Sequence, residues 1–415
     1  MKKVIFDLDG TIYETNSSIL GAVEETMKEF GLPPVEVTQV SQNIGKTLDS
    51  FLMSLLPEQV DLEAFKEGFR INERAAVRKH GRLFCGVTEL LKELKNRDYS
   101  LFICSNGSES YINLVLESTG IRDYFSGITS SKYLTSKGQA FRSLTLEGDF
   151  AIIVGDTAID YLGAVEAGLP SIAASYGYGR EEDHALAVFR AANPLEVLDK
   201  LLLAEIFHEI TSELIGRKKC RCIGINGVDT SGKTRFAEQY ARYLEAVHVK
   251  NQILHMDDFH NPASIRYQGD SEIEAYYYNA FNYRQVIEEV LQPFKAEGSL
   301  NKVILCHNLD TDRYDTERHY ILESASVLLM EGVLLFREPL LSYLDGKIFL
   351  AISFDEVINR AKLRDVPMYG EEFLEKYKNK YIPVQSKYLQ EHKPMEVSDI
   401  IIDNTDFRQP RLLKL

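Results

Sequence analysis

The sequence predicts an α/β protein with two doubly wound parallel-sheet domains, each a three-layer α/β/α sandwich, and three observations support this prediction. The chain has 415 residues, more than one compact core usually holds. In each half, short apolar runs typical of buried parallel strands alternate with stretches of helical period. Polar motifs follow these runs directly, at the sheet edge where doubly wound folds bind their ligands.

The first half contains three strand-like runs, at residues 3–6, 101–104 and 151–154. Residues from about 16 to 82 interrupt the alternation with amphipathic helical stretches. We interpret this segment as a helical cap inserted into a first domain of residues 1–205. The cap would cover the sheet edge at which the polar motifs are expected to meet.

Asp7 and Asp9 follow the first strand and are separated by one residue, so both carboxylates are expected to face one pocket while Leu8 points away. One carboxylate can attack phosphorus and the other can carry a proton. Such an attack divides the hydrolysis of a phosphate monoester into formation and breakdown of a phosphoaspartate. Mg²⁺ is needed to screen the repulsion between the two anions. The pair therefore predicts a magnesium-dependent phosphatase.

A second pair of carboxylates follows the third strand of this half. Asp156 and Asp160 lie four residues apart, which is about one turn of a helix. Carboxylate oxygens are ligands that Mg²⁺ prefers, so this pair can complete a metal site with Asp7 and Asp9.

Groups that can bind phosphate occur between these two pairs. Ser105 and Asn106 follow the second strand and can donate hydrogen bonds to phosphoryl oxygens. Lys137 can neutralise the charge that develops during transfer, and Lys132 is the alternative lysine in the same segment. We expect these groups to converge on the pocket of the carboxylates.

In this order, these motifs resemble the four motifs of the haloacid dehalogenase-like hydrolases. The resemblance covers roughly residues 1–205, and residues 163–179 are similar to the phosphoglycolate phosphatase and β-phosphoglucomutase branch, which carries a helical cap after its first motif. The roles implied by the resemblance are Asp7 as nucleophile, Asp9 as general acid and base, Ser105 and Lys137 as phosphate ligands, Asp156 as a Mg²⁺ ligand supported by Asp160, and Lys46 in the cap loop 43–47 as a substrate contact. For Lys46 a second interpretation is open, because a lysine on a helical cap is often a solvated surface charge.

A domain boundary is expected near the basic run 216–219, which ends a helical pattern. We assign residues 206–217 to a linker helix and residues 218–415 to the second domain. A strand at residues 220–225 then leads into a glycine-rich loop with the pattern G-x-x-x-x-G-K-T. Strand, loop and following helix together are typical of a nucleotide-binding P-loop.

The P-loop predicts a site for ATP and Mg²⁺. Backbone N–H groups of the loop can hold phosphates, Lys233 can reach the outer phosphates, and the hydroxyl of Thr234 can bind Mg²⁺. The residues expected to contact the nucleotide are Gly227, Asp229, Thr230, Ser231, Gly232, Lys233 and Thr234.

Neighbouring segments favour a kinase over a nucleotide-driven switch. Asp257 ends a short apolar strand, where its carboxylate could take the proton of an acceptor hydroxyl. Glu331 ends another apolar strand and is a predicted partner of Mg²⁺. Arg360, Lys362 and Arg364 lie on one helical segment that could close over the transferring phosphate.

Residues 218–415 are similar to the uridine kinase family and its relatives, pantothenate kinase and phosphoribulokinase. The similarity is carried by residues 257–259, 331–333, 364–365 and 399–406. It implies ATP-dependent phosphorylation of a hydroxyl, with Asp257 as base and Arg364 in a closing lid. The chain has Tyr369 where uridine kinases commonly have arginine, so the acceptor is left open. Candidate acceptor contacts are His260, Arg266, Tyr267, Tyr277 and Asn279, although aromatic runs such as 276–278 are also typical of a core.

Composition disfavours several other classes of protein. The net charge is −15 and no basic stripe is present, so binding to nucleic acid is not expected. No apolar stretch approaches the roughly 20 residues of a membrane helix. The N-terminus leads directly into a strand that carries chemistry, which predicts a cytoplasmic protein. Cysteines near strand-like runs are expected to be buried thiols, and Cys220 and Cys222 are too closely spaced for a usual zinc site.

These observations predict a bifunctional enzyme that uses Mg²⁺ and ATP. One domain would hydrolyse a small phosphate monoester, and the other would phosphorylate a nucleoside-like or sugar-like alcohol. Two alternatives remain open. The P-loop domain could bind ATP without catalysis and regulate the phosphatase, or the chain could process nucleic-acid ends as polynucleotide kinase-phosphatases do. The acidic composition disfavours the second alternative.

Overall fold

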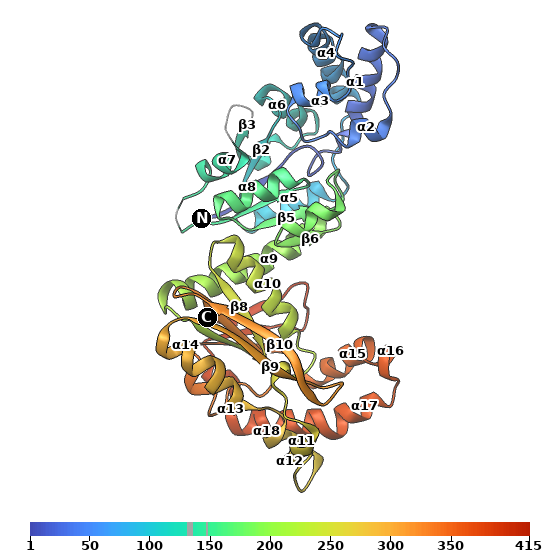
Figure 1. Cartoon of the computed structure of the whole chain (residues 1–415). Coiled ribbons are helices and arrows are strands. Elements are labelled where there is room, and N and C mark those ends of the chain that lie inside the picture. Colours follow the sequence, from blue (N-terminus) through green and yellow to red (C-terminus); the bar gives the residue numbers. More distant parts are fainter. Residues whose placement is uncertain (131–135, 147) are drawn as a thin grey trace. The chain divides into compact units, whose positions relative to one another are not determined.

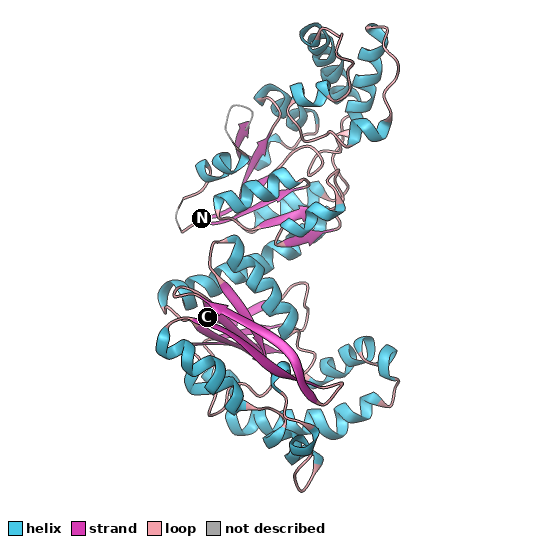
Figure 2. Ribbon diagram, in the orientation of Figure 1, coloured by secondary structure: helices cyan, strands magenta, loops and turns pink. Residues whose placement is uncertain are grey.

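The computed structural model describes residues 1–130, 136–146 and 148–415, so the alternative lysine, Lys132, lies outside the described residues. The chain forms two compact units, Met1–Glu205 and Ile206–Leu415 (Figure 1). Each unit has a parallel sheet with helices on both sides (Figure 2). The predicted α/β fold class with two parallel-sheet domains is therefore confirmed.

The first unit is built on a six-stranded sheet in the order β3–β2–β1–β4–β5–β6, and all neighbouring strands are parallel. Its central strands are almost entirely buried, as expected when helices cover both faces. The parallel pairing brings the carboxyl ends of β1, β2 and β4 to one edge. The strands are β1 (Lys2–Phe6), β2 (Ser100–Ser105), β3 (Phe125–Ser130), β4 (Phe150–Gly155), β5 (Ser171–Ala174) and β6 (Phe189–Ala191).

Helices with one apolar face connect these strands. Helix α5 buries Val87, Leu90, Leu91 and Leu94, a spacing that places all four side chains on one side of a helix. Helices α7 and α8 pack against each other, and α8 contacts β4. The helices between the strands are α5 (Val87–Asn96), α6 (Glu109–Ser118), α7 (Lys137–Ser143) and α8 (Ala158–Ala167).

The predicted helical cap is present and has an apolar core of its own. Helices α1 and α4 pack along each other, and Phe51, Phe65 and Phe69 are among the side chains buried between the cap helices. The carboxylate of Asp61 caps α4 by accepting hydrogen bonds from two backbone N–H groups of its first turn. The cap helices are α1 (Asn16–Glu29), α2 (Val37–Ser41), α3 (Leu48–Met53) and α4 (Leu62–His80).

The second unit is built on a sheet in the order β14–β13–β12–β7–β11–β8, which is parallel except for its antiparallel edge strand β14. A separate antiparallel ribbon pairs β9 with β10. The sequence analysis predicted neither β14 nor the ribbon. The strands are β7 (Cys222–Gly227), β8 (Asn251–His255), β9 (Leu300–Asn308), β10 (Arg313–Leu322), β11 (Val327–Gly332), β12 (Gly346–Ala351), β13 (Ile400–Asp403) and β14 (Arg411–Lys414).

Helices complete the second unit. The ring of Phe207, from the end of α9, packs 5.1 Å from that of Phe236 and 5.2 Å from that of Tyr240, both on α10. A π-helical segment, Thr211–Arg217, continues α9. Helix α9 (Pro194–Ile210) begins in the first unit and ends in the second. The other helices of the second unit are α10 (Lys233–Ala246), α11 (Ala263–Arg266), α12 (Glu272–Asn279), α13 (Tyr283–Val286), α14 (Gln292–Glu297), α15 (Phe354–Arg364), α16 (Val366–Tyr369), α17 (Phe373–Lys376), α18 (Ile382–His392) and α19 (Pro394–Val397).

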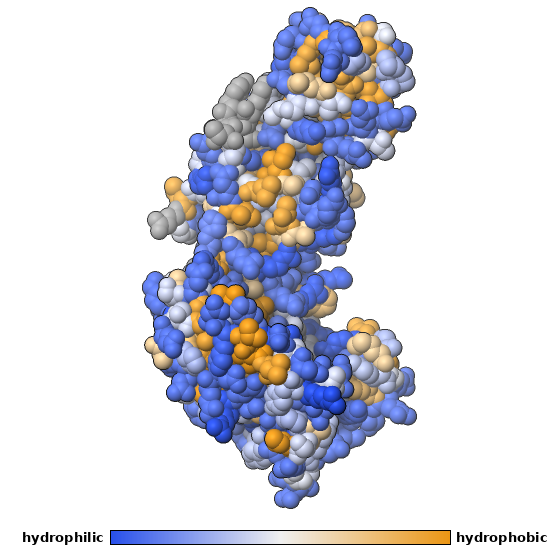
Figure 3. Space-filling view, viewed as in Figure 1, coloured by the Kyte–Doolittle hydropathy of each residue, from blue (hydrophilic) through white to orange (hydrophobic). Residues whose placement is uncertain are grey.

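The surface is largely hydrophilic on the face drawn in Figure 3, with apolar side chains gathered over the β9–β10 ribbon. Val303, Leu305 and Ile321 are exposed on that ribbon. Within the described ranges, no helix combines the length and apolar character needed to cross a bilayer. Four of the cysteines are buried, as predicted, whereas Cys85 is exposed.

Candidate active sites

The first candidate site lies at the carboxyl ends of β1, β2 and β4. Asp7 follows β1 and is held there by a hydrogen bond from its backbone N–H to the carbonyl of Val154, 2.8 Å away. The ammonium of Lys137 lies 2.9 Å from the carboxylate of Asp7 and 2.5 Å from that of Asp160. All three side chains are almost completely buried. The structure thus brings together four of the predicted residues, because Asp156 joins the same cluster.

Asp7, Asp156 and Asp160 form a cluster in which the three carboxylate oxygens lie within 4.8 Å of one another. Helix α8 holds Asp160 in place, since its carboxylate accepts hydrogen bonds from the backbone N–H and hydroxyl of Thr157. Asp156 accepts a hydrogen bond of 2.8 Å from the backbone N–H of Tyr178. Three carboxylates against one lysine leave excess negative charge, so these residues fit a divalent cation such as Mg²⁺.

The electrostatics of this cluster follow from burial and from close charges. Burial raises the pKa of Asp7 to about 7; Lys137 opposes this rise, and Asp160 adds to it. Burial also raises the pKa of Asp156 well above its usual range. Burial disfavours the charge on Lys137, but Asp160 and Asp7 outweigh that effect and hold its pKa above the ordinary value. Lys137 therefore stays protonated.

The backbone at Gly10 allows the cluster to pack closely. Its φ of +78° is strained for other residues, and a Cβ added there would lie 2.1 Å from the carboxylate of Asp156. A glycine is therefore required directly after the two aspartates of the first motif.

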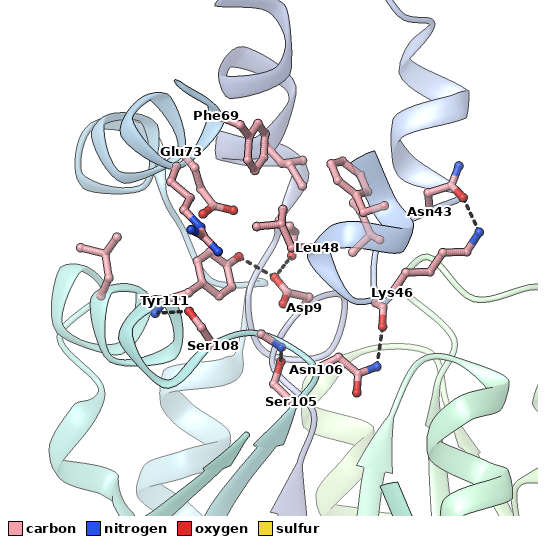
Figure 4. Close-up of a pocket in the computed structure, with 18 of the residues that line it drawn as sticks. Asp9, Asn43, Lys46, Leu48, Phe69, Glu73, Ser105, Asn106, Ser108 and Tyr111 are labelled. Carbon is pink, nitrogen blue, oxygen red and sulfur yellow. Dashed lines mark hydrogen bonds between the residues drawn. The ribbon is translucent and has the colours of Figure 1, made fainter. Parts of the chain in front are cut away.

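Asp9 lies beside the cluster with different partners. Its carboxylate accepts hydrogen bonds from the hydroxyls of Thr15, at 2.8 Å, and Tyr111, at 2.7 Å (Figure 4). Burial raises the pKa of Asp9, which favours a group that holds a proton. In the part of the chain that the structure describes, the carboxylate cluster does not include Asp9. Its surroundings suit a group that transfers a proton, and the roles of Asp9 as acid and base and at the metal stay predictions.

The two predicted phosphate-binding residues after β2 have different surroundings. The hydroxyl of Ser105 is buried and accepts a hydrogen bond of 3.1 Å from the backbone N–H of Gly107. The amide of Asn106 donates to the backbone carbonyl of Gly45 in the cap, 2.8 Å away. Lys46, predicted to contact substrate, is exposed and donates to Asn43 at 2.6 Å. Asn106 therefore connects the sheet edge to the cap loop.

A cavity of 340 Å³ separates the cap from the sheet edge. Its wall includes residues of α4 and α6 that the sequence analysis did not identify, because no motif marks them. The lining residues of interest are Asp7, Asp9, Ser105, Asn106 and Lys46 from the predictions, and Phe69, Arg70, Glu73, Arg74, Ser108, Ser110 and Tyr111 in addition.

The second candidate site begins at the loop between β7 and α10. Thr230 and Gly232 have left-handed φ values of 56° and 89°, which turn the backbone of the loop. The ammonium of Lys233 donates to the carbonyl of Val228, 2.9 Å away, so it folds back over the loop. Ser231 is fully buried, and its hydroxyl has no partner within the described part of the chain.

Other segments hold this loop from outside. Asp229 is bound to Gln385 of α18 through both its backbone N–H, at 2.9 Å, and its carboxylate, at 2.5 Å. The guanidinium of Arg360 donates to the carbonyl of Thr230 at 3.0 Å. Gly227 ends β7, and a Cβ there would lie 2.6 Å from the hydroxyl of Ser231. The predicted nucleotide-contacting residues thus form one compact loop.

The two residues predicted to bind Mg²⁺ in the second unit meet directly. The hydroxyl of Thr234 donates to the carboxylate of Glu331 at 3.1 Å, and the same oxygen lies 2.8 Å from Nδ1 of His255. The hydrogen bond with Glu331 raises the pKa of His255. The sequence analysis missed His255, although it ends β8 beside the predicted base. A hydroxyl and a carboxylate in contact fit a Mg²⁺ site.

The predicted base and lid residues lie on segments around the loop. Asp257 follows β8, and its carbonyl lies 2.9 Å from Nδ1 of His260. Arg364, at the end of α15, is paired with Asp365 at 2.8 Å and with the hydroxyl of Tyr377 at 3.0 Å. Burial is the main cause that raises the pKa of Asp229 in the P-loop. The charge of Asp257 adds to this rise and the charge of Arg364 opposes it, so the three side chains lie in one electrostatic environment.

The candidate acceptor region differs from the prediction at one tyrosine. Tyr277 is buried in the core, where its hydroxyl donates to Glu391. Burial is the main cause that raises the pKa of the neighbouring Tyr276, and the charges of Asp229 and Asp257 raise it further. The ammonium of Lys380 lies 5.3 Å from the ring of Tyr276. Adjacent helical residues point about 100° apart, so the two tyrosines have different surroundings.

The other predicted acceptor residues lie around Lys380 or beside Asp257. The ammonium of Lys380 is 5.4 Å from the ring of Tyr267. Arg266 stacks on the same tyrosine at 5.1 Å, and its buried Nε has no partner among the residues described. Asn279 donates to the carbonyl of Gln268 at 2.7 Å and so supports the turn after α11.

Comparisons with known proteins identify relatives of each unit. Residues 4–174 match the haloacid dehalogenase-like hydrolase family, and residues 222–407 match the phosphoribulokinase / uridine kinase family. A phosphoglycolate phosphatase of Agrobacterium fabrum is 30% identical over 188 residues, which cover 42% of this chain and 80% of that protein. The chain therefore belongs to the haloacid dehalogenase-like hydrolases through its first unit and to the phosphoribulokinase / uridine kinase family through its second. It is an enzyme with a hydrolase domain and a kinase domain.

Two solved structures are also similar to parts of the chain. A haloacid dehalogenase-like hydrolase from Streptococcus pneumoniae is 29% identical, covers 48% of this chain and 97% of its own, and has a TM-score of 0.43. A protein described as a possible uridine kinase from Bacillus stearothermophilus is 22% identical, covers 49% of this chain and 97% of its own, and has a TM-score of 0.39.

Proposed function

We propose that the chain is a bifunctional enzyme. Its first unit hydrolyses a small phosphate monoester through a phosphoaspartate with Mg²⁺, and its second unit transfers phosphate from ATP to a hydroxyl of a nucleoside-like or sugar-like molecule. The observation that best supports the proposal is the buried cluster of Asp7, Asp156 and Asp160 around Lys137, next to a cavity lined by Asp9.

In the phosphatase, Asp7, Asp156 and Asp160 would hold Mg²⁺, which screens the charge of the phosphate. A carboxylate oxygen of Asp7 attacks phosphorus, and the bond from phosphorus to the leaving oxygen breaks while Asp9 gives that oxygen its proton. Asp9 then takes a proton from the water that hydrolyses the phosphoaspartate. Lys137 lies 2.9 Å from Asp7 and would stabilise the charge on the phosphoryl oxygens.

In the kinase, Thr234 and Glu331 would hold Mg²⁺, which neutralises charge on the phosphates of ATP. Lys233 turns from the carbonyl of Val228 toward the outer phosphates when nucleotide binds. Asp257 accepts the proton of the acceptor hydroxyl as its oxygen attacks the terminal phosphorus and ADP leaves. Arg364 is held mainly by Asp365, but its charge also lowers the pKa of Asp229, which burial raises, and this supports a position of the arginine near the P-loop.

The test uses two substitutions in the full chain, with released phosphate and consumed ATP as separate readouts against a panel of metabolites. We expect Asp7→Asn to abolish phosphate release and to leave ATP use intact, and Lys233→Ala to do the reverse. Each variant is thus the matched control of the other. Phosphatase turnover that survives Asp7→Asn, or ATP use that survives Lys233→Ala, would contradict the corresponding site. ATP binding without consumption would favour the regulatory alternative.

We further propose that the two domains act on different compounds. A phosphatase and a kinase with a common substrate would hydrolyse ATP in a futile cycle. The same panel tests this, because a compound that is phosphorylated by one domain and dephosphorylated by the other without any regulation contradicts it.

A further inference from the structure

We propose that Glu73 of the cap recognises the alcohol part of the phosphatase substrate, and that the group it binds is a hydroxyl of a polyol or sugar rather than a carboxylate. This inference rests on the proposed phosphatase function and specifies the class of its substrate. It goes beyond the likeness to phosphoglycolate phosphatases, because phosphoglycolate carries a carboxylate at the position in question.

Glu73 lies on α4 and lines the cavity between the cap and the sheet edge. Figure 4 shows Glu73 and Phe69 on the cap side of this cavity, with Ser105 and Asn106 on the opposite side. A phosphate bound at Asp7 and Ser105 would therefore direct its alcohol part toward the cap. The cavity volume of 340 Å³ lies within the range of about 300 to 1,000 Å³ that is usual for small-molecule sites.

The carboxyl group of Glu73 makes no hydrogen bond or ion pair within residues 1–130, 136–146 and 148–415. Other polar side chains in the same wall are engaged. Tyr111 and Thr15 donate to Asp9, and Lys46 donates to Asn43. A polar group shielded from water without a partner is costly, so it is usually retained where a ligand supplies the partner. Among the described residues of this wall, Glu73 is therefore the acidic group left to bind substrate.

The charges around Glu73 decide which ligand fits. Burial, the main cause, and then Asp9 raise the pKa of Glu73 to about 8, so its carboxyl group is largely protonated at neutral pH. A substrate carboxylate could only accept from this group and would leave its second oxygen without a donor. A hydroxyl can both accept from the protonated group and donate to it, and Ser108 and Ser110 offer further hydroxyls in the same wall.

Two arginines of α4 would instead attract a substrate carboxylate. Arg70 and Arg74 line the cavity and lower the pKa of Glu73, but neither lies within ion-pair distance of it among the described residues. Both arginines are exposed, so water and salt screen their attraction for a carboxylate. Glu73 is less exposed than either arginine, so its hydrogen bonds to a substrate are less weakened by water than their attraction for a carboxylate. A hydroxyl therefore fits this side of the cavity better than a carboxylate.

The apolar part of the wall is compatible with the carbon skeleton of such a substrate. Leu48, Phe51 and Phe69 line the cavity beside Glu73. Pockets for small molecules typically combine apolar walls with a few polar groups that fix orientation. Glu73 would provide this orientation on the cap side, and Ser105 would provide it at the phosphate.

The experiment measures kcat and KM of the full chain for four phosphate monoesters: glycerol 3-phosphate, ribose 5-phosphate, phosphoglycolate and phosphoethanolamine. Para-nitrophenyl phosphate serves as a probe without a hydroxyl or carboxylate for Glu73. The variants are Glu73→Leu, Glu73→Gln as the conservative change, and Glu67→Gln as the matched control, because Glu67 is exposed on the same helix and does not line the cavity. Equal thermal unfolding of the variants would show that the cap is intact.

We expect the wild type to prefer a polyol or sugar phosphate over phosphoglycolate. Glu73→Leu should lower kcat/KM for that substrate by about 10- to 100-fold, mainly through KM, while para-nitrophenyl phosphate changes little. Glu73→Gln should restore part of the loss, since its amide can donate and accept, and Glu67→Gln should leave the preference unchanged.

Several outcomes would overturn the inference. These are hydrolysis of phosphoglycolate at least as fast as of the polyol and sugar phosphates, a best substrate that carries an amine, or an unchanged preference in Glu73→Leu. Failure of the proposed function is distinguishable, because the wild type would then not hydrolyse para-nitrophenyl phosphate, or Asp7→Asn would hydrolyse it equally well.

Discussion

Replacement of Lys137 by methionine tests the view that one buried cation holds the carboxylate cluster together. Methionine is unbranched and apolar, so it fills a similar space without the charge. The ammonium lies 2.9 Å from Asp7 and 2.5 Å from Asp160, and the three side chains are at most 4% exposed. Each contact is worth about 6 kcal/mol of Coulomb energy at an effective dielectric constant of about 20. The cost of removing the charges from water offsets much of this.

The net effect is the cost of leaving buried carboxylates without a cation, about 3 to 5 kcal/mol. With a guanidinium chloride m-value of about 4 kcal/mol/M, the unfolding midpoint of the first unit should fall by about 1 M. The assay is denaturation of the full chain followed by circular dichroism, in buffer with a chelator and again with Mg²⁺. Because Mg²⁺ would neutralise the same carboxylates, it should recover part of the loss.

Lys46→Met is the matched control, since Lys46 is exposed and its loss should change stability by no more than about 0.5 kcal/mol. The reasoning would be refuted if Lys137→Met were as stable as Lys46→Met in the chelator. It would also be refuted if Mg²⁺ stabilised the wild type more than the Lys137→Met variant, because the variant has more negative charge to neutralise.

Three further predictions concern single hydrogen bonds and one titration. Tyr111→Phe removes a donor to Asp9, so the pKa of the catalytic acid should rise by about one unit in the pH profile of kcat/KM; an unshifted profile would contradict this. Glu331→Gln should raise the Mg²⁺ concentration that half-saturates ATP consumption by at least about 10-fold, and an unchanged requirement would exclude its metal role. Burial lowers the pKa of His260, assisted by Arg266 and His307 and opposed by Asp257. Below pH 6.5 the folded chain therefore binds fewer protons at His260 than the unfolded chain does. The free energy of unfolding should then decrease as the pH is lowered through this range. His260→Gln should weaken this fall, and an identical pH dependence of unfolding in variant and wild type would argue against it.

Much of the fold and of both catalytic centres could be predicted from the sequence because the signals are local. A buried strand followed by polar residues defines a sheet edge without knowledge of the rest of the chain, which is how Asp7, Ser105 and Asp156 could be assigned to one site. The P-loop is equally local, since strand, loop and helix are contiguous. The β9–β10 ribbon is different. Its exposed, charged second strand has no buried-strand pattern, and its register depends on the partner strand.

The sequence by itself indicated the chemistry: two carboxylate pairs at strand ends, a lysine between them in the chain and a phosphate-binding loop. Only the tertiary structure decided that Lys137 is buried and which other side chains lie beside these groups. Glu73 lines the cavity, His255 joins Glu331, and Tyr277 lies in the core. The physical reason is that helical periodicity shows which residues share a face. Where that face is directed depends on packing against distant segments.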